Sequence, residues 1–326
     1  MHVYLRIDYY RNMKKITKLF ILSPLAFSLA GCGETSSSSS STPKDPEPCD
    51  VIVISGQSNA VGISHSSCIT RSIGASKYQE YLRGYDGIQI AFDNWDKLYQ
   101  YDPPQFYSQH SSKDDTFMKV MLGQGNGDAT FGPEIGIAEK MHEKYSGKLF
   151  LIKFACGASN LRDDWALRES PMYGRFISYV KLQMENLKKM GYIPTIKAFC
   201  WMQGEGDAYD GLSNVYYENI KGFVTNVRAD LKELSGNVDM PFIDAGINNV
   251  KDGHDQYKWP NWEEVNNAKK QFAAESDNNF YIDTIAAGLH SNQEPFAEPD
   301  LAHYDTESQV LLGRMFAENF EPFLMK

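Results

Sequence analysis

The chain has 326 residues, a formal charge of −10 and 42% hydrophobic residues. Its length suits one large domain or two small ones, and its hydrophobic content excludes wholesale disorder. Residues 1–32 contain five of the 32 basic and one of the 42 acidic groups, so the remainder has a net charge of −14. Because such a surface repels nucleic acid and anionic lipid, we expect neither as a partner.

The N-terminus predicts an export signal. Lysines precede an apolar run, Leu19–Ala30, which is too short to span a bilayer and fits the core of a signal peptide. The run ends in Leu29-Ala30-Gly31-Cys32, which resembles the lipobox of bacterial lipoproteins. This resemblance implies that residues 1–31 are removed and that lipidated Cys32 anchors the protein to a membrane, at the periplasmic face or the cell surface. The alternative is an ordinary signal peptide with an incidental cysteine, and translation from Met13 leaves either signal intact.

Residues 32–48 predict a tether, because a serine run, Ser36–Ser41, and the proline-rich stretch after it bury no apolar surface. The folded domain is therefore expected to span residues 49–326. Export permits disulfides among the four cysteines that follow, and the sequence leaves their pairing open. A Cys49–Cys68 bond would pin the start of the domain, whereas Cys156 and Cys200 lie in strand-like segments where free buried thiols are expected.

Short apolar runs alternate with helical patterns along this domain. The runs are apolar on both faces, as in strands of a covered parallel sheet, and they occupy residues 51–54, 149–154, 196–202, 242–247 and 280–282. Their alternation with helices predicts a doubly wound α/β fold with five parallel strands.

Amphipathic patterns predict helices over 134–145, around the stripe Phe176–Leu187 and over Tyr216–Leu234. A final helix is expected to begin at Thr306, where a glutamine three residues on completes a capping-box pattern. Residues 64–131 show little periodicity, so they predict a long irregular insert.

Ligands bind beyond the carboxyl ends of the strands in such sheets, so the residues after each strand are the candidates for chemistry. Ser58 follows the first strand in Gly56-Gln57-Ser58-Asn59, on a tight turn into a helix start that suits a nucleophile. This is not the Gly-x-Ser-x-Gly elbow of other hydrolases, and an N-cap serine is the alternative. Gly157 follows the second strand, where its backbone can approach a ligand or simply turn.

Trp201-Met202-Gln203-Gly204-Glu205-Gly206-Asp207 follows the third strand. Gln203 offers an amide donor at the strand end. Glu205 and Asp207 form either the acid/base pair of a glycosidase or a pair that holds neighbouring loops, and we favour the holding role.

His303 is the candidate base, because Asp300 precedes it by one turn and can fix its tautomer. His290 is a rival late in the chain, but it lacks an upstream aspartate at that spacing. A histidine at either position is also compatible with an ordinary surface residue.

Together these blocks resemble the SGNH hydrolase superfamily, and within it the carbohydrate esterases of the sialate O-acetylesterase and acetylxylan esterase type (carbohydrate esterase family 6-like). The resemblance covers roughly residues 50–322 and includes Gly132-Pro133-Glu134, while the Trp201–Asp207 block is its most specific part. It implies a flavodoxin-like three-layer α/β/α fold. The second block, usually Gly-Gly-Thr, here reads Gly157-Ala158-Ser159, which puts that oxyanion donor in question.

The resemblance implies that Ser58 attacks an acetyl carbonyl, that His303 takes its proton and that Asp300 orients His303. It assigns the oxyanion to the N–H groups of Ser58 and Gly157 and the side chain of Gln203, before water hydrolyses the acyl-enzyme. The supporting residues are Gln57, Asn59, Glu205 and Asp207. We expect no cofactor and no metal, because no cluster of side chains has ligand spacing.

The expected substrate is an acetylated polysaccharide or glycan. Trp95, Tyr99, Tyr101 and Phe106 of the insert either stack on sugar rings or form a small core. A non-catalytic glycan-binding lipoprotein is one alternative, although the three catalytic side chains are present. A lipase or thioesterase of the same superfamily is another, although polar residues surround the blocks.

Overall fold

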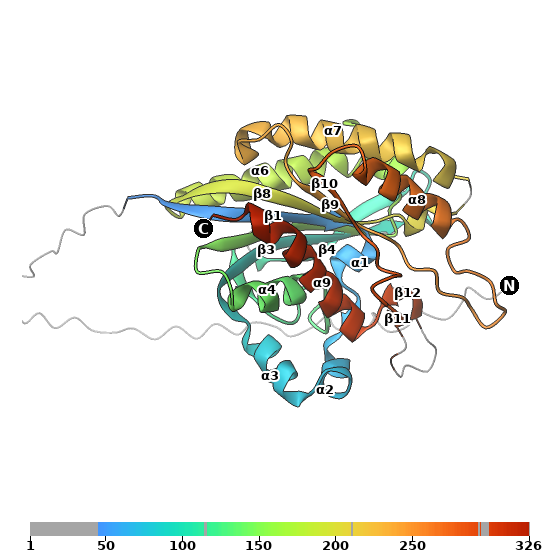
Figure 1. The fold of residues 1–326 in the computed structure, drawn as a ribbon, viewed down its shortest axis with the longest axis horizontal. Coiled ribbons are helices and arrows are strands. Elements are labelled where there is room, and N and C mark those ends of the chain that lie inside the picture. The colour runs from blue at the N-terminus through green and yellow to red at the C-terminus, as the bar shows by residue number, and fades with distance from the viewer. Residues whose placement is uncertain (1–44, 114–115, 210, 293, 295–299, 326) are drawn as a thin grey trace, which may run out of the picture. The chain divides into compact units, whose positions relative to one another are not determined.

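The computed structural model describes residues 45–113, 116–209, 211–292, 294 and 300–325 (Figure 1). The predicted signal peptide, Cys32 and most of the predicted tether lie outside the described residues. The first strand, β1 (Glu47–Gly56), includes the last two residues of that predicted tether. Within the described part of the chain, no helix has the length and apolar character needed to cross a membrane.

The five predicted strands form the parallel centre of one sheet. They lie side by side in the order β7 (Leu149–Gly157), β1, β8 (Tyr192–Met202), β9 (Phe242–Ala245) and β10 (Asn279–Ile282). In chain order this is the 2-1-3-4-5 arrangement of flavodoxin-like folds, so the predicted fold class is confirmed. Its switch point lies at β1, whose two neighbours run parallel to it.

The prediction of an irregular insert over residues 64–131 was wrong, and so was the count of five strands. β3 (Tyr85–Leu98) pairs parallel with β7, and β4 (Gln105–Ser111) and β5 (Met118–Val120) pair antiparallel with β3, which makes an eight-stranded mixed sheet. The strand signal of β3 is weak because several polar residues interrupt its apolar run. Some of these, such as Gln89 and Asp93, are partly exposed, whereas Asn94 and Lys97 are buried. The remaining insert elements are β2 (Ser64–His65), η1 (Ser66–Cys68), α2 (Ile69–Ser72), α3 (Ala75–Arg83) and β6 (Thr130–Phe131).

Helices cover both faces of the sheet (Figure 1). One face carries α4 (Glu134–His142) and α9 (Thr306–Phe320), and the other carries α6 (Tyr173–Lys189), α7 (Tyr216–Ser235) and α8 (Trp262–Ala273). The four predicted helices are confirmed, whereas α8 was not predicted. The short elements are α1 (Ser58–Val61), α5 (Leu161–Asp164), η3 (Glu205–Asp207), η4 (Ser213–Val215), β11 (Ser291–Asn292), β12 (Asp300–Tyr304) and η5 (Glu321–Phe323).

The predicted capping box of the last helix is not formed. Asp305 is the N-cap and its side chain accepts a hydrogen bond from the Ser308 N–H at 2.9 Å. The side chain of Gln309 instead donates to the Asn59 carbonyl oxygen at 2.9 Å, so the glutamine contacts the segment that carries Ser58.

All four cysteines of the described residues are buried and free, so the Cys49–Cys68 bond considered above is not present. Burial raises the pKa of Cys49 to about 12, which keeps its thiol protonated. Cys156 and Cys200 lie in the core as expected.

A buried ion pair fixes the C-terminal end of α1 against the sheet. Lys153 of β7 and Glu134 of α4 are both fully buried, with Nζ and Oε2 2.8 Å apart. Lys153 Nζ also donates to the carbonyl oxygens of Val61, at 3.0 Å, and Gln124, at 2.7 Å. The Gly132-Pro133-Glu134 block therefore acts through Lys153, which binds the last residue of the helix that begins at Ser58.

Candidate active site

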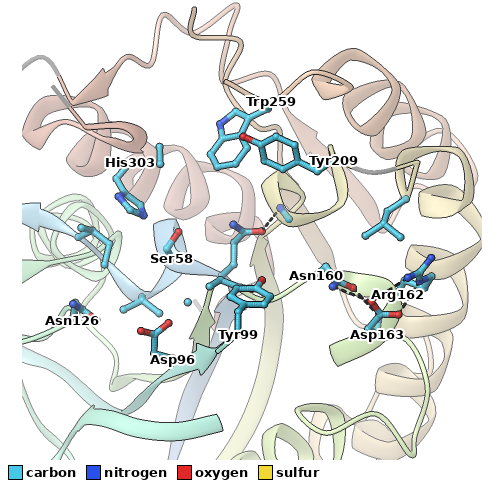
Figure 2. A pocket seen from close by; sticks show the side chains of 18 residues that line it. Ser58, Asp96, Tyr99, Asn126, Asn160, Arg162, Asp163, Tyr209, Trp259 and His303 are labelled. Atoms are coloured by element: carbon cyan, nitrogen blue, oxygen red, sulfur yellow. Dashed lines mark hydrogen bonds and ion pairs between the residues drawn. The ribbon is translucent and has the colours of Figure 1, made fainter. Parts of the chain in front are cut away.

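A pocket of about 770 Å³ opens beyond the carboxyl ends of β1, β7 and β8 (Figure 2). Ser58, Gly157 and His303, from three of the predicted blocks, line it. Its size lies within the range of about 300–1,000 Å³ that is usual for small-molecule sites. The pocket is therefore the candidate active site.

Ser58 enters this pocket because Gly56 permits a close turn. Gly56 has a φ of +140°, and a Cβ there would lie 1.9 Å from the Met202 carbonyl oxygen of β8. Only glycine tolerates both the dihedral angle and the contact. The chain therefore leaves β1 against the end of β8 and presents Ser58 at the first position of α1.

His303 and Asp300 form a hydrogen-bonded pair on β12. His303 Nδ1 lies 2.6 Å from Asp300 Oδ2, and Asp300 Oδ1 accepts the Ala302 N–H at 2.9 Å. Burial favours a higher pKa for Asp300, but the hydrogen bond and charge of His303 outweigh it, so this pKa lies below its usual value. An ionised Asp300 keeps a proton on Nδ1 and leaves Nε2 able to accept one.

Asn59 connects the segments that carry Ser58 and His303. Its Oδ1 accepts the Tyr304 N–H at 3.0 Å, and its Nδ2 donates to Glu205 Oε1 at 2.7 Å and to the Ala302 carbonyl oxygen at 3.4 Å. These bonds flank His303 on both sides along β12. In Figure 2 the Ser58 hydroxyl and the His303 ring accordingly lie on the same side of the pocket.

Gln57 makes a second connection on the other side of Ser58. Its Oε1 accepts hydrogen bonds from Gln203 Nε2 at 3.2 Å, the Gly204 N–H at 3.2 Å and the Gly206 N–H at 3.1 Å. One buried amide thus fixes the loop after β8 against the turn after β1, and Gly206 of that loop lines the pocket.

The structure does not bring Gln203 to the pocket. Its side chain is fully buried, and Nε2 donates to both Gln57 Oε1 and Asp207 Oδ2, the latter at 2.6 Å. Both amide hydrogens are therefore engaged. The expected contribution of Gln203 to an oxyanion site does not fit this geometry, and its contacts are those of a residue that holds Gln57 and Asp207 in place.

Glu205 and Asp207 are also buried and do not line the pocket. Asp207 Oδ2 accepts the Leu161 N–H at 2.7 Å, which fixes the start of α5. Burial raises the pKa of Asp207 to about 6 and also raises the pKa of Glu205, whose Oε1 is held by Asn59. The two carboxyl groups therefore occupy the holding positions favoured from the sequence, and neither can contact a sugar as a glycosidase acid would.

The rival base and most of the insert aromatics lie away from this site. His290 is exposed and does not line the pocket. Among the four aromatic candidates, Tyr99 lines the pocket, whereas Trp95 and Phe106 pack against the core and Tyr101 is exposed elsewhere.

Seven further side chains with polar or aromatic groups line the pocket without having been predicted: Asp96, Asn126, Asn160, Arg162, Asp163, Tyr209 and Trp259. Tyr209 follows β8 and Trp259 follows β9. The centroids of their rings lie 5.4 Å apart, and the ring planes are inclined at 73°. Their position after strand ends is a signal that the sequence contained. The others lie on the insert, in α5 or at its N-cap, where no pattern marks them.

A flavodoxin-like sheet with a serine and an Asp-paired histidine beyond its strand ends defines a hydrolase of the SGNH type. The chain belongs to the family described as "Carbohydrate esterase, sialic acid-specific acetylesterase", whose model matches residues 48–321. The protein is accordingly a carboxylic ester hydrolase of the carbohydrate acetylesterase class.

Solved structures share this fold. A protein from Arabidopsis thaliana is 21% identical, with a TM-score of 0.55, over 85% of this chain and 100% of its own. NanS is 13% identical, with a TM-score of 0.57, over 86% and 99%. A carbohydrate acetylesterase from Xanthomonas citri is 15% identical, with a TM-score of 0.51, over 84% of this chain and 56% of its own. Among curated proteins, no sequence matches the chain.

The position of Asn59 predicts a defect in both activity and stability when its amide is removed. Asn59→Ala frees β12 from α1, and a misplacement of about 1 Å lowers turnover about 10²-fold. It also leaves the buried Glu205 and the Tyr304 N–H without these partners, which destabilises the fold by about 1–3 kcal/mol. Hydrolysis of p-nitrophenyl acetate and urea unfolding measure the two effects. The exposed Asn237→Ala is the control, and full turnover by Asn59→Ala contradicts the assignment.

Proposed function

We propose that the protein removes O-acetyl groups from carbohydrate through an acyl-enzyme, with Ser58 as nucleophile and His303 as general base. The observation that carries this proposal is the joint position of Ser58 and the His303–Asp300 pair at one pocket, connected by Asn59. Membership of a carbohydrate esterase family supports the reaction class.

In the proposed mechanism, the Asp300 carboxylate accepts a hydrogen bond from the Nδ1–H group of His303. Nε2 can therefore accept the Ser58 hydroxyl proton as Oγ attacks the acetyl carbon. The N–H groups of Ser58 and Gly157 are the proposed donors to the oxyanion, and each such donor is typically worth about 10²–10³ in rate. Collapse returns the proton from Nε2 to the sugar oxygen and releases the alcohol. Water then repeats the sequence on the acetyl-enzyme.

The polar lining of the pocket supports a carbohydrate ester over a lipid or thioester. Charged or amide side chains occur at Asp96, Asn126 and Arg162. A long acyl chain would place apolar surface against these groups and leave them without water. The intact hydrogen bond between His303 and Asp300 likewise favours an enzyme over a glycan-binding protein without catalysis.

Ser58→Ala should lower the release of acetate from acetylated xylan and p-nitrophenyl acetate by about 10⁴-fold or more, because the nucleophile is lost. Purified residues 48–326 provide the material, and the exposed Ser67→Ala is the control. Unchanged unfolding would show that the loss is chemical. Undiminished turnover by Ser58→Ala would end the serine mechanism.

We also propose that the mature protein is exported and anchored through lipid on Cys32, on the basis of the Leu29-Ala30-Gly31-Cys32 motif. Cells fed a labelled fatty acid should incorporate label into the wild-type protein, because the cysteine thiol is the acceptor. Cys32→Ser should remove the label and the protein should leave the membrane fraction. Label that persists in Cys32→Ser contradicts the anchor.

A further inference from the structure

Asp96 is a charged group in the pocket that the proposed mechanism does not use. It lies near the end of β3, opposite Gly157 of β7, and its Oδ1 accepts the Lys97 N–H at 2.9 Å. A Cβ on Gly157 would lie only 2.8 Å from this oxygen, so the carboxyl group rests directly against Gly157. Figure 2 shows the carboxyl group below Ser58 and directed into the same pocket.

The chemistry of ester hydrolysis gives no reason for this carboxylate. His303 already has Asp300 as its partner, and no three metal-ligating side chains gather among the described residues. A negative charge beside Gly157 also opposes the developing oxyanion. Burial raises the pKa of Asp96, although the Lys97 N–H, the Tyr107 hydroxyl and the charge of His303 favour its ionised form. A costly charge at this position therefore suggests contact with the substrate.

Apart from His303, no cationic side chain among the described lining residues compensates Asp96. Among the described lining residues, Arg162 is the one lysine or arginine, and it forms a two-bond pair with Asp163, with Nε to Oδ1 at 2.8 Å and Nη2 to Oδ2 at 3.2 Å. These two charges cancel. Apart from His303, the lining retains the negative charge of Asp96, and an anionic sugar meets no unpaired lysine or arginine there.

We infer that the substrate is a neutral acetylated glycan, and that Asp96 selects it by accepting a hydrogen bond from a free hydroxyl near the ester. A carboxylate is an acceptor only, so it binds sugar hydroxyls and repels the carboxylate of a sialic or uronic acid. The rings of Tyr99, Tyr209 and Trp259 offer apolar faces to a sugar of either charge. This inference rests on the proposed function, and it differs from the specificity named in the family description.

The kinetic test compares acetylated xylotriose with 9-O-acetylated sialic acid. We expect the wild type to favour the neutral ester in kcat/KM, and Asp96→Asn to lower the neutral-to-anionic ratio by about tenfold or more. Turnover of the anionic ester by the wild type should rise with salt, because salt screens the repulsion, and Asp96→Asn should weaken this rise more than removal of a carboxylate outside the pocket does. A purely structural role of Asp96 would leave the salt response unchanged.

Asp128→Asn is the matched control. This carboxyl group is fully exposed, pairs with His110 and does not line the pocket, so its removal deletes the same charge outside the site. The control should keep the wild-type ratio and salt response. A wild type that prefers the sialate ester, or an Asp96→Asn variant that keeps both the ratio and the salt response, would overturn the inference.

A binding measurement separates this inference from the proposed function. Ser58→Ala, with and without Asp96→Asn, is titrated with the same two ligands by calorimetry. The inference is supported if Ser58→Ala binds the neutral ligand more tightly than the sialate ligand and if Asp96→Asn reduces this difference in affinity. This holds even if the wild type hydrolyses neither ester and the proposed function fails. Equal or tighter binding of the sialate ligand by Ser58→Ala overturns it.

Discussion

The hydrogen bonds of the Asn59 side chain are the constraint on which the site depends. The α1 helix has only four residues, so its own backbone bonds cannot fix its direction. Asn59 supplies the missing restraint. It binds β12 on both sides of His303, and it also binds Glu205 on the loop after β8. Gln57 binds that same loop from the other side. Ser58 therefore stands between two buried amides, each anchored to a segment distant in sequence.

The sheet topology explains why these distant segments meet. β1 lies between β7 and β8, so the turns after all three strands share one edge of the sheet at the switch point. Polar groups that hold these turns are necessarily buried, and buried polar groups must be hydrogen-bonded to be tolerated. Asp207 and Gln203 meet this condition through the loops they hold. Glu205 meets it at Oε1, which Asn59 binds, while its buried Oε2 has no hydrogen-bond partner among the described residues. The pocket lining contains Asp96 and the aromatic rings beside Ser58 and His303, so the proposed chemistry and the proposed choice of substrate reside in different side chains.

Much of the fold could be predicted because strands and helices have local sequence patterns. Buried parallel strands such as Val51–Ile54 are apolar on both faces, and helices such as α7 repeat apolar residues at helical spacing. β3 escaped prediction because polar residues interrupt its apolar run. The blocks around Ser58 and His303 could be predicted by resemblance, yet the contacts of Gln203 could not. Which way an amide points depends on partners, here Gln57 and Asp207, that meet only in the folded chain.

In the proposed mechanism the hydroxyl of Ser58 and the imidazole of His303 act as one unit. A crystal structure of the protein after reaction with a phosphonate ester would show whether they do. We expect phosphorus bonded to Ser58 Oγ, with His303 Nε2 within about 2.6–3.2 Å of an oxygen on the adduct. A phosphonate attached to another residue, or a His303 ring turned away from the adduct, would contradict it.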